Sequence, residues 1–551
     1  MCEAVAVAFS MAWAEARAGA RDETDRAWER LAGFRRELYR YFTARADALC
    51  ELCDAALCKQ DRVHMLAELS LEPGHQRGHG ALYDALNCGK VQVSRLRWAL
   101  AGVPLPAWDD GRIRLAADVS NWLRPDAATS PGRSFCHCYG RGNNSAQMIP
   151  GWPYSLIAAL EPGRTSWTRL LDAVRLGPDD DLAAVTAAQV RGVIERIIAV
   201  GHWHDGDPDI MVIFDAGYEP ARPAWLLRDL PVQVLGRLGT NRVLRQAPPP
   251  RRPGQMGPPV RHGCELKLSD DAACPGPDVH TTTQTSRYGA ADARAWHRVH
   301  PKLKARGAWA GHQGELPVIE GTLIKLTAGH LPHDRAPKPV WLWASCPDAD
   351  SDEVNRCWQA FLRRFDIEHT FRFLKQVLGW TRPRLRDPAA AGRWTWLILA
   401  GHAQLWLART MTADLRLPWQ RPAPAGRLTP ARVRRGFRAV HGTLPRLAAA
   451  PKPGKPGPGR PPGSKNRHPA ARHDVDPGGL FAKRRARYSI RLAPMAMILS
   501  AAVPSPVPAA EWVCHVHAAC RLARAGSADR RGDRGHVRFP EDGTAAGGGG
   551  P

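Results

Sequence analysis

The chain has 551 residues and carries 77 Lys and Arg against 53 Asp and Glu, a formal net charge of +24. No uncharged apolar run approaches the ~20 residues of a transmembrane helix, and Glu3 stands where a secretory signal would be basic, so we exclude membrane-spanning and secreted proteins and expect a cytoplasmic one. Residues 432–491 hold 14 of the 24 net charges, which indicates a polyanionic partner, nucleic acid before membrane.

Residues 1–110 are predicted to form a helical N-terminal domain, because polar and apolar residues alternate with a helical period through 25–57. Residues 80–100 are predicted to form two short helices around a turn at 87–89. This pattern fits a helix-turn-helix DNA reader, but it fits an ordinary helical hairpin better.

Residues 111–244 change to a pattern in which strands and helices alternate. Apolar strands are predicted at 112–120, 209–217 and 231–238, and a helix at 186–200 precedes the second of them. Such alternation indicates an α/β core.

The α/β pattern is interrupted over residues 245–350. Residues 245–310 are rich in Pro, Gly, Thr and Arg, and two segments after them, 316–328 and 338–345, are predicted to pair as antiparallel strands. We interpret this region as a β-rich insertion, after which the α/β core resumes over 351–448. Residues 449–551 begin with a basic Pro/Gly-rich linker and end in a tail without a pattern, so we expect them to be disordered when free.

The most informative stretch is FLRRFDIEHTFRFLK at 361–375, predicted as one largely buried helix. At 100° per residue, Phe361, Arg364, Glu368 and Lys375 fall in one narrow sector. A carboxylate flanked by two cations on a buried helix is costly unless it is paired or binds something. Taken alone, the helix fits a structural ion network better than a functional site.

Two aspartates accompany predicted strands: Asp118 lies at the polar end of 112–120 and Asp215 at the carboxyl end of 209–217. Each alone also fits a turn residue. Open α/β sheets place their chemistry at the carboxyl ends of strands, so both could converge with Glu368 on two divalent cations. Carboxylate ligands favour Mg²⁺ or Mn²⁺, and two such ions can promote attack of water or a 3′-hydroxyl on phosphorus.

These segments together resemble the DDE-type insertion-sequence transposases that carry a β-rich insertion between the second Asp and the Glu. That group has a Y-x2-R-x3-E-x6-K signature, and here Phe361 stands in the Tyr place while Arg364, Glu368 and Lys375 keep the spacing. The segments that carry the resemblance are 115–127, 135–161, 208–219 and 358–380.

The resemblance implies a ribonuclease-H-like catalytic core interrupted by the insertion. It further implies that Asp118, Asp215 and Glu368 are catalytic and bind Mg²⁺, with Mn²⁺ as an alternative. Arg364 and Lys375 are expected to contact DNA near the transposon end, and Phe361 lacks the hydroxyl for one phosphate hydrogen bond. A homodimer on paired DNA ends is expected as well.

A second DNA-binding feature lies in the linker, where Gly459-Arg460-Pro461 resembles an AT-hook. In such a segment the arginine, here Arg460, lies in a narrow minor groove. A basic linker that binds any polyanion fits the same residues.

We therefore predict a nucleoid-associated DNA transposase that cleaves double-stranded DNA at terminal inverted repeats and joins the ends to target DNA. The alternatives are a catalytically inactive DNA-binding remnant of a transposable element and a stand-alone nuclease of the same fold.

Overall fold

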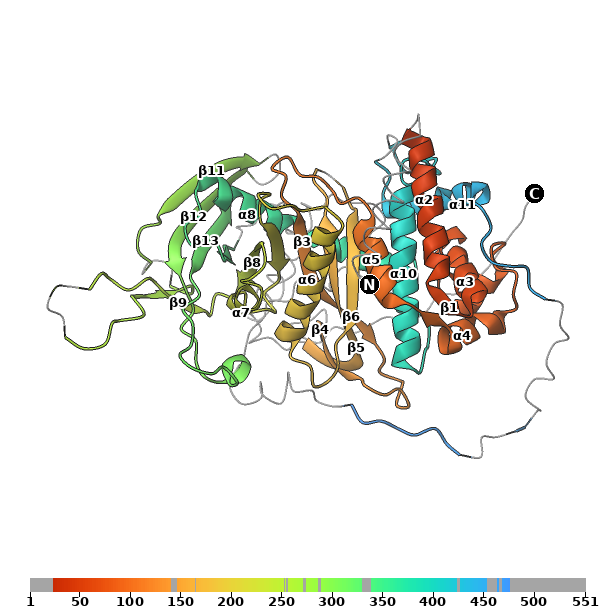
Figure 1. Ribbon diagram of the computed structural model, residues 1–551, viewed down its shortest axis with the longest axis horizontal. Coiled ribbons are helices and arrows are strands. Elements are labelled where there is room, and N and C mark those ends of the chain that lie inside the picture. The colour runs from red at the N-terminus through yellow and green to blue at the C-terminus, as the bar shows by residue number, and fades with distance from the viewer. Residues whose placement is uncertain are drawn as a thin grey trace, which may run out of the picture.

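The computed structural model describes residues 23–139, 146–163, 165–251, 253, 256–270, 274–285, 289–329, 338–423, 427–452, 463–464 and 468–475. Figure 1 shows a twisted sheet with helices on its faces and a bundle of helices at one end.

The centre of the structure is a mixed sheet. Strand β3 (Arg114–Leu123) pairs in parallel with β7 (Ile210–Phe214), which pairs in parallel with β8 (Val232–Leu238). On its other side β3 pairs antiparallel with the long β5 (Ala146–Leu160). The prediction of an α/β fold is confirmed, and the mixed sheet is consistent with a ribonuclease-H-like core.

Both sides of this centre are extended. The outer edge of β5 pairs with β4 (Ser134–Tyr139) along its first half and with β6 (Thr168–Arg175) along its second. On the opposite side, β14 pairs antiparallel with β8 and continues through three more strands, so strands between residues 245 and 350 lengthen the same sheet. These four are β11 (Val279–Thr285), β12 (Gly289–Val299), β13 (Gly321–Ala328) and β14 (Val340–Ala344).

The shorter elements lie around this frame. The strands β1 and β2 form one small antiparallel sheet, and β9 and β10 form another. Their bounds and those of the short helices are β1 (Phe42–Ala44), β2 (Lys90–Val91), β9 (Val243–Arg245), β10 (Glu265–Lys267), η1 (Leu66–Leu71), α7 (Ala221–Leu226) and η3 (Gly307–Trp309).

The two faces of the sheet bury different cores, because successive strand residues point to opposite sides. Leu115 of β3 packs into the core beneath α6 (Leu182–Ala199). Its neighbour Ala116 joins the core that includes α9 (Phe365–Gln376) and α10 (Pro388–Ala408). The sheet is therefore covered on both sides, and α9 is held on the face opposite α6.

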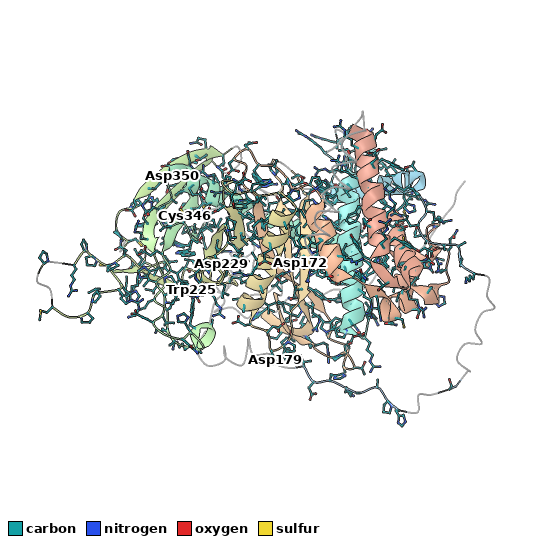
Figure 2. The ribbon with its side chains drawn as sticks, in the orientation of Figure 1. Asp172, Asp179, Trp225, Asp229, Cys346 and Asp350 are labelled. Atoms are coloured by element: carbon teal, nitrogen blue, oxygen red, sulfur yellow. The ribbon has the colours of Figure 1, made fainter. Side chains whose placement is uncertain are left out.

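One buried ion cluster ties the helices to the sheet edge. The carboxylate of Asp172 in β6, which Figure 2 labels, accepts hydrogen bonds from Arg97 Nε at 3.0 Å and from Arg196 Nη2 at 2.8 Å. Arg196 belongs to α6, and Arg97 belongs to α5, whose buried face packs toward α10. This carboxylate therefore joins one helix from each side of the sheet to β6.

Helix α10 is the axis of the helical bundle in Figure 1, with α2 alongside it. Its side chains are buried nearly all round, which explains its long apolar run. Arg35 of α2 links the parts, donating to Asp54 of α3 and to Gln404 of α10. The bundle helices are α2 (Glu23–Arg40), α3 (Ala46–Cys58), α4 (His79–Cys88), α5 (Val93–Gly102) and α11 (Pro430–Thr443).

The two helices predicted over 80–100 are α4 and α5, and the last turn of α4 contacts α10. Arg393 of α10 donates to the carbonyl oxygens of Leu86 and Asn87, while Leu96 and Leu100 of α5 are buried in the core. Both helices therefore pack against α10, and β2 lies between them in the chain. Among the described helices, none is long and apolar enough to cross a membrane.

Two predicted elements differ in extent from those observed. The strand predicted at 112–120 continues to Leu123, because β5 pairs with β3 along that whole length, so Asp118 lies within the strand rather than at its end. The helix predicted at 361–375 is divided into α8 (Ser351–Arg363) and α9, with Arg364 at the junction. The predicted pairing of the strands at 316–328 and 338–345 is confirmed by β13 and β14.

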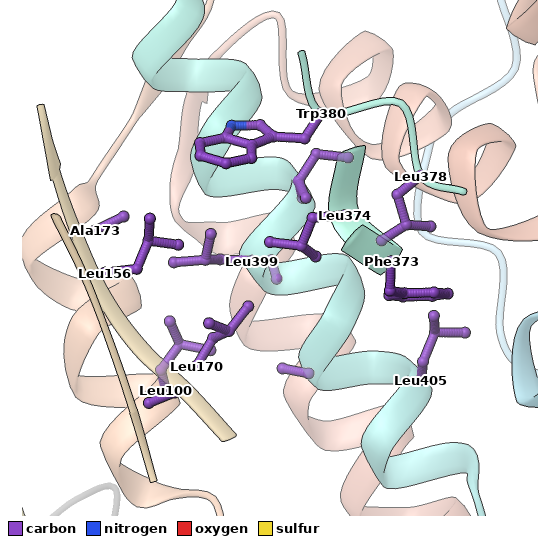
Figure 3. Close-up of a cluster of buried hydrophobic side chains, with 14 of the residues drawn as sticks. Leu100, Leu156, Leu170, Ala173, Phe373, Leu374, Leu378, Trp380, Leu399 and Leu405 are labelled. Carbon is purple, nitrogen blue, oxygen red and sulfur yellow. The ribbon is translucent and has the colours of Figure 1, made fainter. Parts of the chain in front are cut away.

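Figure 3 shows the end of α9 in a cluster of buried side chains, where Phe373 and Leu374 lie together with Leu399 and Leu405 of α10 and with strand residues. Leu374→Ala should lower the free energy of unfolding by about 2–5 kcal/mol, because a fully buried side chain would leave a cavity. Denaturant unfolding measures this value. The control Leu71→Ala, at a side chain that is 83% exposed, should change it by less than about 0.5 kcal/mol; equal effects would contradict the assigned burial of α9.

Candidate active site

The position of Asp118 in the site follows from the different lengths of β3 and β7. Strand β7 ends at Phe214, which pairs with Ala117, whereas β3 continues past Ala117 because β5 supports it. Asp118 is therefore the first residue of β3 beyond the end of its parallel neighbour, and Asp215 directly follows that end. The fold brings these two residues, 97 positions apart in the chain, to adjacent strands.

The third carboxylate comes from α9. Asp350 caps the preceding helix α8 by accepting from the Glu353 backbone, and Arg364 continues with helical backbone angles, φ −52° and ψ −31°. Helix α9 begins at Phe365, so Glu368 lies in its first turn. Carboxylates are stabilised there by the positive end of the helix dipole.

Arg364 lies between the three carboxylates and contacts all of them. Its Nη1 donates to Asp118 Oδ2 at 2.9 Å, and its Nη2 donates to Glu368 Oε1 at 3.3 Å. The same Nη2 lies 3.5 Å from Asp215 Oδ1. One guanidinium therefore gathers side chains from two strands and one helix.

The surroundings of Arg364 remove it from water. Its side chain is 2% exposed, and its guanidinium carbon lies 5.7 Å from the ring centroid of Phe361 and 4.9 Å from that of Phe365. Burying a guanidinium costs free energy, and the surrounding anions offset this cost. Phe361 is thus a buried packing residue beside Arg364. The Arg364 guanidinium contacts the three acids in this structure, and its contact with DNA stays a prediction.

The protonation of the acids reflects this arrangement. Burial raises the pKa of Glu368 to about 7 and that of Asp118 to about 6, with Arg364 opposing both shifts and the neighbouring carboxylates adding to them. Burial also acts to raise the pKa of Asp215, but Arg364 and Arg237 outweigh it and hold that pKa below its usual range. Asp215 is therefore the most firmly ionised of the three.

Arg237 is a residue of this site that the sequence analysis missed. In the parallel pairing of β7 with β8, Phe214 is opposite Gly236. Asp215 and Arg237 are the residues that directly follow this pair, so they lie at corresponding positions along the two chain segments. Burial lowers the pKa of Arg237, with Asp215 opposing the shift. Aligning the carboxyl ends of the two predicted strands would have drawn attention to a cation next to the second aspartate.

Lys375 lies at the other end of α9, away from the ion cluster. Its Nζ is 5.8 Å from the ring centroid of Trp380, and burial lowers its pKa to about 8, opposed by Cys138, Cys136 and Asp118. Within the described ranges it forms no ion pair. The structure thus separates Lys375 from Arg364, and its contact with DNA stays a prediction. Arg460 lies outside the described residues.

The donor set suits a hard divalent cation, since three carboxylates converge and Asp215 Oδ1 is buried without a hydrogen bond from any described residue. As the side chains stand, no group of three His, Cys, Asp or Glu in the described part of the chain is arranged to hold a metal ion. Arg364 lies between the carboxylates where a cation would bind. Asp118, Asp215 and Glu368 therefore fit Mg²⁺ chemically, provided that the guanidinium gives way.

Comparison with known families agrees with this site in part. A family described as DDE superfamily endonuclease matches residues 37–302, just under half of the chain. The match includes Asp118 and Asp215, while Arg364, Glu368 and Lys375 lie beyond it. The resemblance to a DDE-type transposase or endonuclease is confirmed by this match. A search of curated proteins found none similar to the chain.

The raised pKa values make a prediction for metal-free protein. Because folded Glu368 binds its proton more tightly than the unfolded chain does, its contribution to stability should fall as the pH rises from 4.5 to about 7, at no more than about 1.4 kcal/mol per pH unit. Glu368→Gln should make the dependence of melting temperature on pH in EDTA shallower over this range.

The matched control is Glu315→Gln, at a glutamate whose side chain is 72% exposed, which should leave the pH dependence as in the parent. If the parent and Glu368→Gln instead show the same slope, the raised pKa of Glu368 is wrong.

Proposed function

We propose that this protein is a DNA transposase, which cleaves DNA at transposon ends in a metal-dependent reaction and transfers the cleaved strands into target DNA. The observation that carries the proposal is the convergence of Asp118, Asp215 and Glu368 on one buried guanidinium. The family match supports the coarser assignment to a nuclease, and the net charge of +24 supports a DNA substrate.

The three acids would hold Mg²⁺, with Mn²⁺ as an alternative. When bound, the metal would supply charge neutralisation at phosphorus and a more acidic water. Asp215 is ionised in the metal-free site, whereas Glu368 and Asp118 must release any bound proton before they can ligate. Metal affinity should therefore rise with pH through about 7, the raised pKa of Glu368.

The cations of the site are proposed to act electrostatically and to take no part in making or breaking bonds. Arg364 and Arg237 offset the repulsion between clustered carboxylates and an incoming phosphodiester. Lys375 and Arg460 are proposed DNA contacts outside the carboxylate cluster. The paired-end complex is proposed to contain two copies of the chain.

The proposed reaction consists of two displacements at phosphorus. In the first, the oxygen of water bonds to phosphorus as the bond to the 3′-oxygen breaks, and the proton lost by water is balanced by protonation of the leaving 3′-oxygen. In the second, the oxygen of this 3′-hydroxyl bonds to a target phosphorus as the bond to the target 3′-oxygen breaks, and the proton lost by the hydroxyl is balanced by protonation of the leaving oxygen. Each displacement exchanges one P–O bond for another, so neither needs an external energy source.

A stand-alone nuclease is the second candidate, because the matched family is described as an endonuclease and that description does not include strand transfer. Such an enzyme would perform only the first displacement. A catalytically inactive remnant is less favoured, since three acids remain gathered around one cation.

Purified protein with Mg²⁺ and a labelled DNA end from its own locus should nick the DNA at the end and join it to a target plasmid. Asp215→Asn and Glu368→Gln should abolish nicking, because each removes a carboxylate, while gel-shift assays show that DNA binding is retained. The control Asp229→Asn changes an exposed aspartate paired with Arg191 and should cleave as the parent does.

Nicking without joining would identify the stand-alone nuclease. Binding without nicking in the parent would identify the remnant, and nicking by the two acid variants at the parental rate would contradict the assigned site.

A further inference from the structure

The loop between α10 and α11 exposes an apolar and basic group of side chains. Leu415 is 50% exposed, Leu417 37% and Trp419 69%. Arg416 and Arg421, also exposed, lie on either side, and residues 415–421 contain no acid. Large apolar side chains that lie together at the surface indicate a binding site rather than chance exposure.

The loop is held firmly by α11. Arg435 Nη1 donates to Leu415 O at 2.9 Å, and its Nη2 donates to Gln420 Oε1 at 3.0 Å. Arg432 Nη2 donates to Arg421 O at 2.8 Å. Since two arginines brace the backbone on both sides of Trp419, the indole is presented to solvent by an ordered loop and would lose little conformational freedom on binding.

The charge on this loop favours an anionic partner. The nearest acid in the sequence, Asp414, is engaged by Arg432 at 3.2 Å and by the backbone N–H of Ala423. Neither Arg416 nor Arg421 forms an ion pair with any other described residue. Arg416 and Arg421 thus flank the exposed Trp419 in the sequence, and no carboxylate in the described part of the chain neutralises either of them.

The loop is also connected to the candidate active site. Arg409, just before the loop, pairs with Glu161 at 2.7 Å, and Leu428, just after it, accepts from Trp167 Nε1 at 2.7 Å. Both contacts fix the loop to the β5–β6 turn. The carbonyl oxygen of Glu161 accepts a hydrogen bond from Arg363, the neighbour of Arg364, so the residues that flank the loop contact the same turn as the residue before Arg364.

We propose that residues 415–421 bind DNA next to the cleavage site, with Trp419 stacking on an unpaired base at a DNA end while Arg416 and Arg421 contact its backbone. Aromatic rings beside cations are the common means of binding single-stranded nucleic acid. This inference rests on the proposed function in requiring a DNA substrate.

Fluorescence anisotropy with the full chain tests the stacking contact, using a blunt duplex and the same duplex with a 3′ single-stranded extension. Trp419→Ala should bind the extended DNA about five- to a hundredfold more weakly and the blunt duplex nearly as the parent does. Trp419→Phe should retain most of the affinity. Tyr83→Ala, at an exposed aromatic side chain on α4, should change neither.

The contacts of Arg416 and Arg421 with the DNA backbone are tested by the salt dependence of binding. Replacing both Arg416 and Arg421 with Ala should lower the salt dependence of binding by about one counterion for each, whereas replacing both with Lys keeps the charge and should keep the slope.

The possible failures are distinguishable. If the parent binds neither DNA, the proposed function and this inference both fall. If the parent binds the extended DNA and Trp419→Ala binds it equally, only this inference falls. A change in the sedimentation of DNA-free Trp419→Ala, with DNA affinity unchanged, would overturn it in favour of an interface between copies.

Discussion

The buried guanidinium of Arg364 is the interaction on which the candidate site depends. Three carboxylates brought this close would repel one another, and burial alone would favour their neutral forms. The guanidinium of Arg364 lies 2.9–3.5 Å from all three carboxylates and offsets their repulsion in the absence of a metal. Such a cation is itself stable only because the acids surround it, since removing one partner of a buried ion pair commonly costs about 3–5 kcal/mol.

The scaffold brings these groups together through features far from the chemistry. The early end of β7 leaves Asp118 and Asp215 next to one another, and α6 packs beneath these strands on the opposite face. Helix α9 is pressed against the other face by α10, through Phe373 and Leu374. The strands β11 to β14 extend the same sheet from β8, the strand that also carries Arg237. Backbone hydrogen bonds of one sheet therefore join these strands to the site.

The sequence was sufficient to predict the α/β fold, the strands β7 and β8, the pairing of β13 with β14 and the three acids that lie together. It could not predict the role of Arg364, because helical periodicity aligns Arg364 with Lys375 but does not reveal that one is surrounded by carboxylates and the other by Trp380 and two cysteines. Nor could it predict the continuation of β3 past Asp118 or the proximity of Arg237, since both depend on strand register. The features that the sequence did not reveal all depend on tertiary structure. The local pattern assigns residues to helices and strands, whereas the packing of these elements decides which side chains contact one another.

The central claim is that Arg364 substitutes for a divalent cation among Asp118, Asp215 and Glu368. It is tested most directly by the increase in melting temperature that Mn²⁺ produces at pH 8 in the parent and in Arg364→Met, which removes the charge and retains an unbranched side chain. The variant should be less stable than the parent without metal, and Mn²⁺ should raise its melting temperature by more, because the carboxylates no longer have an internal cation. Equal increases in the two proteins, or a metal-free variant as stable as the parent, would contradict the account.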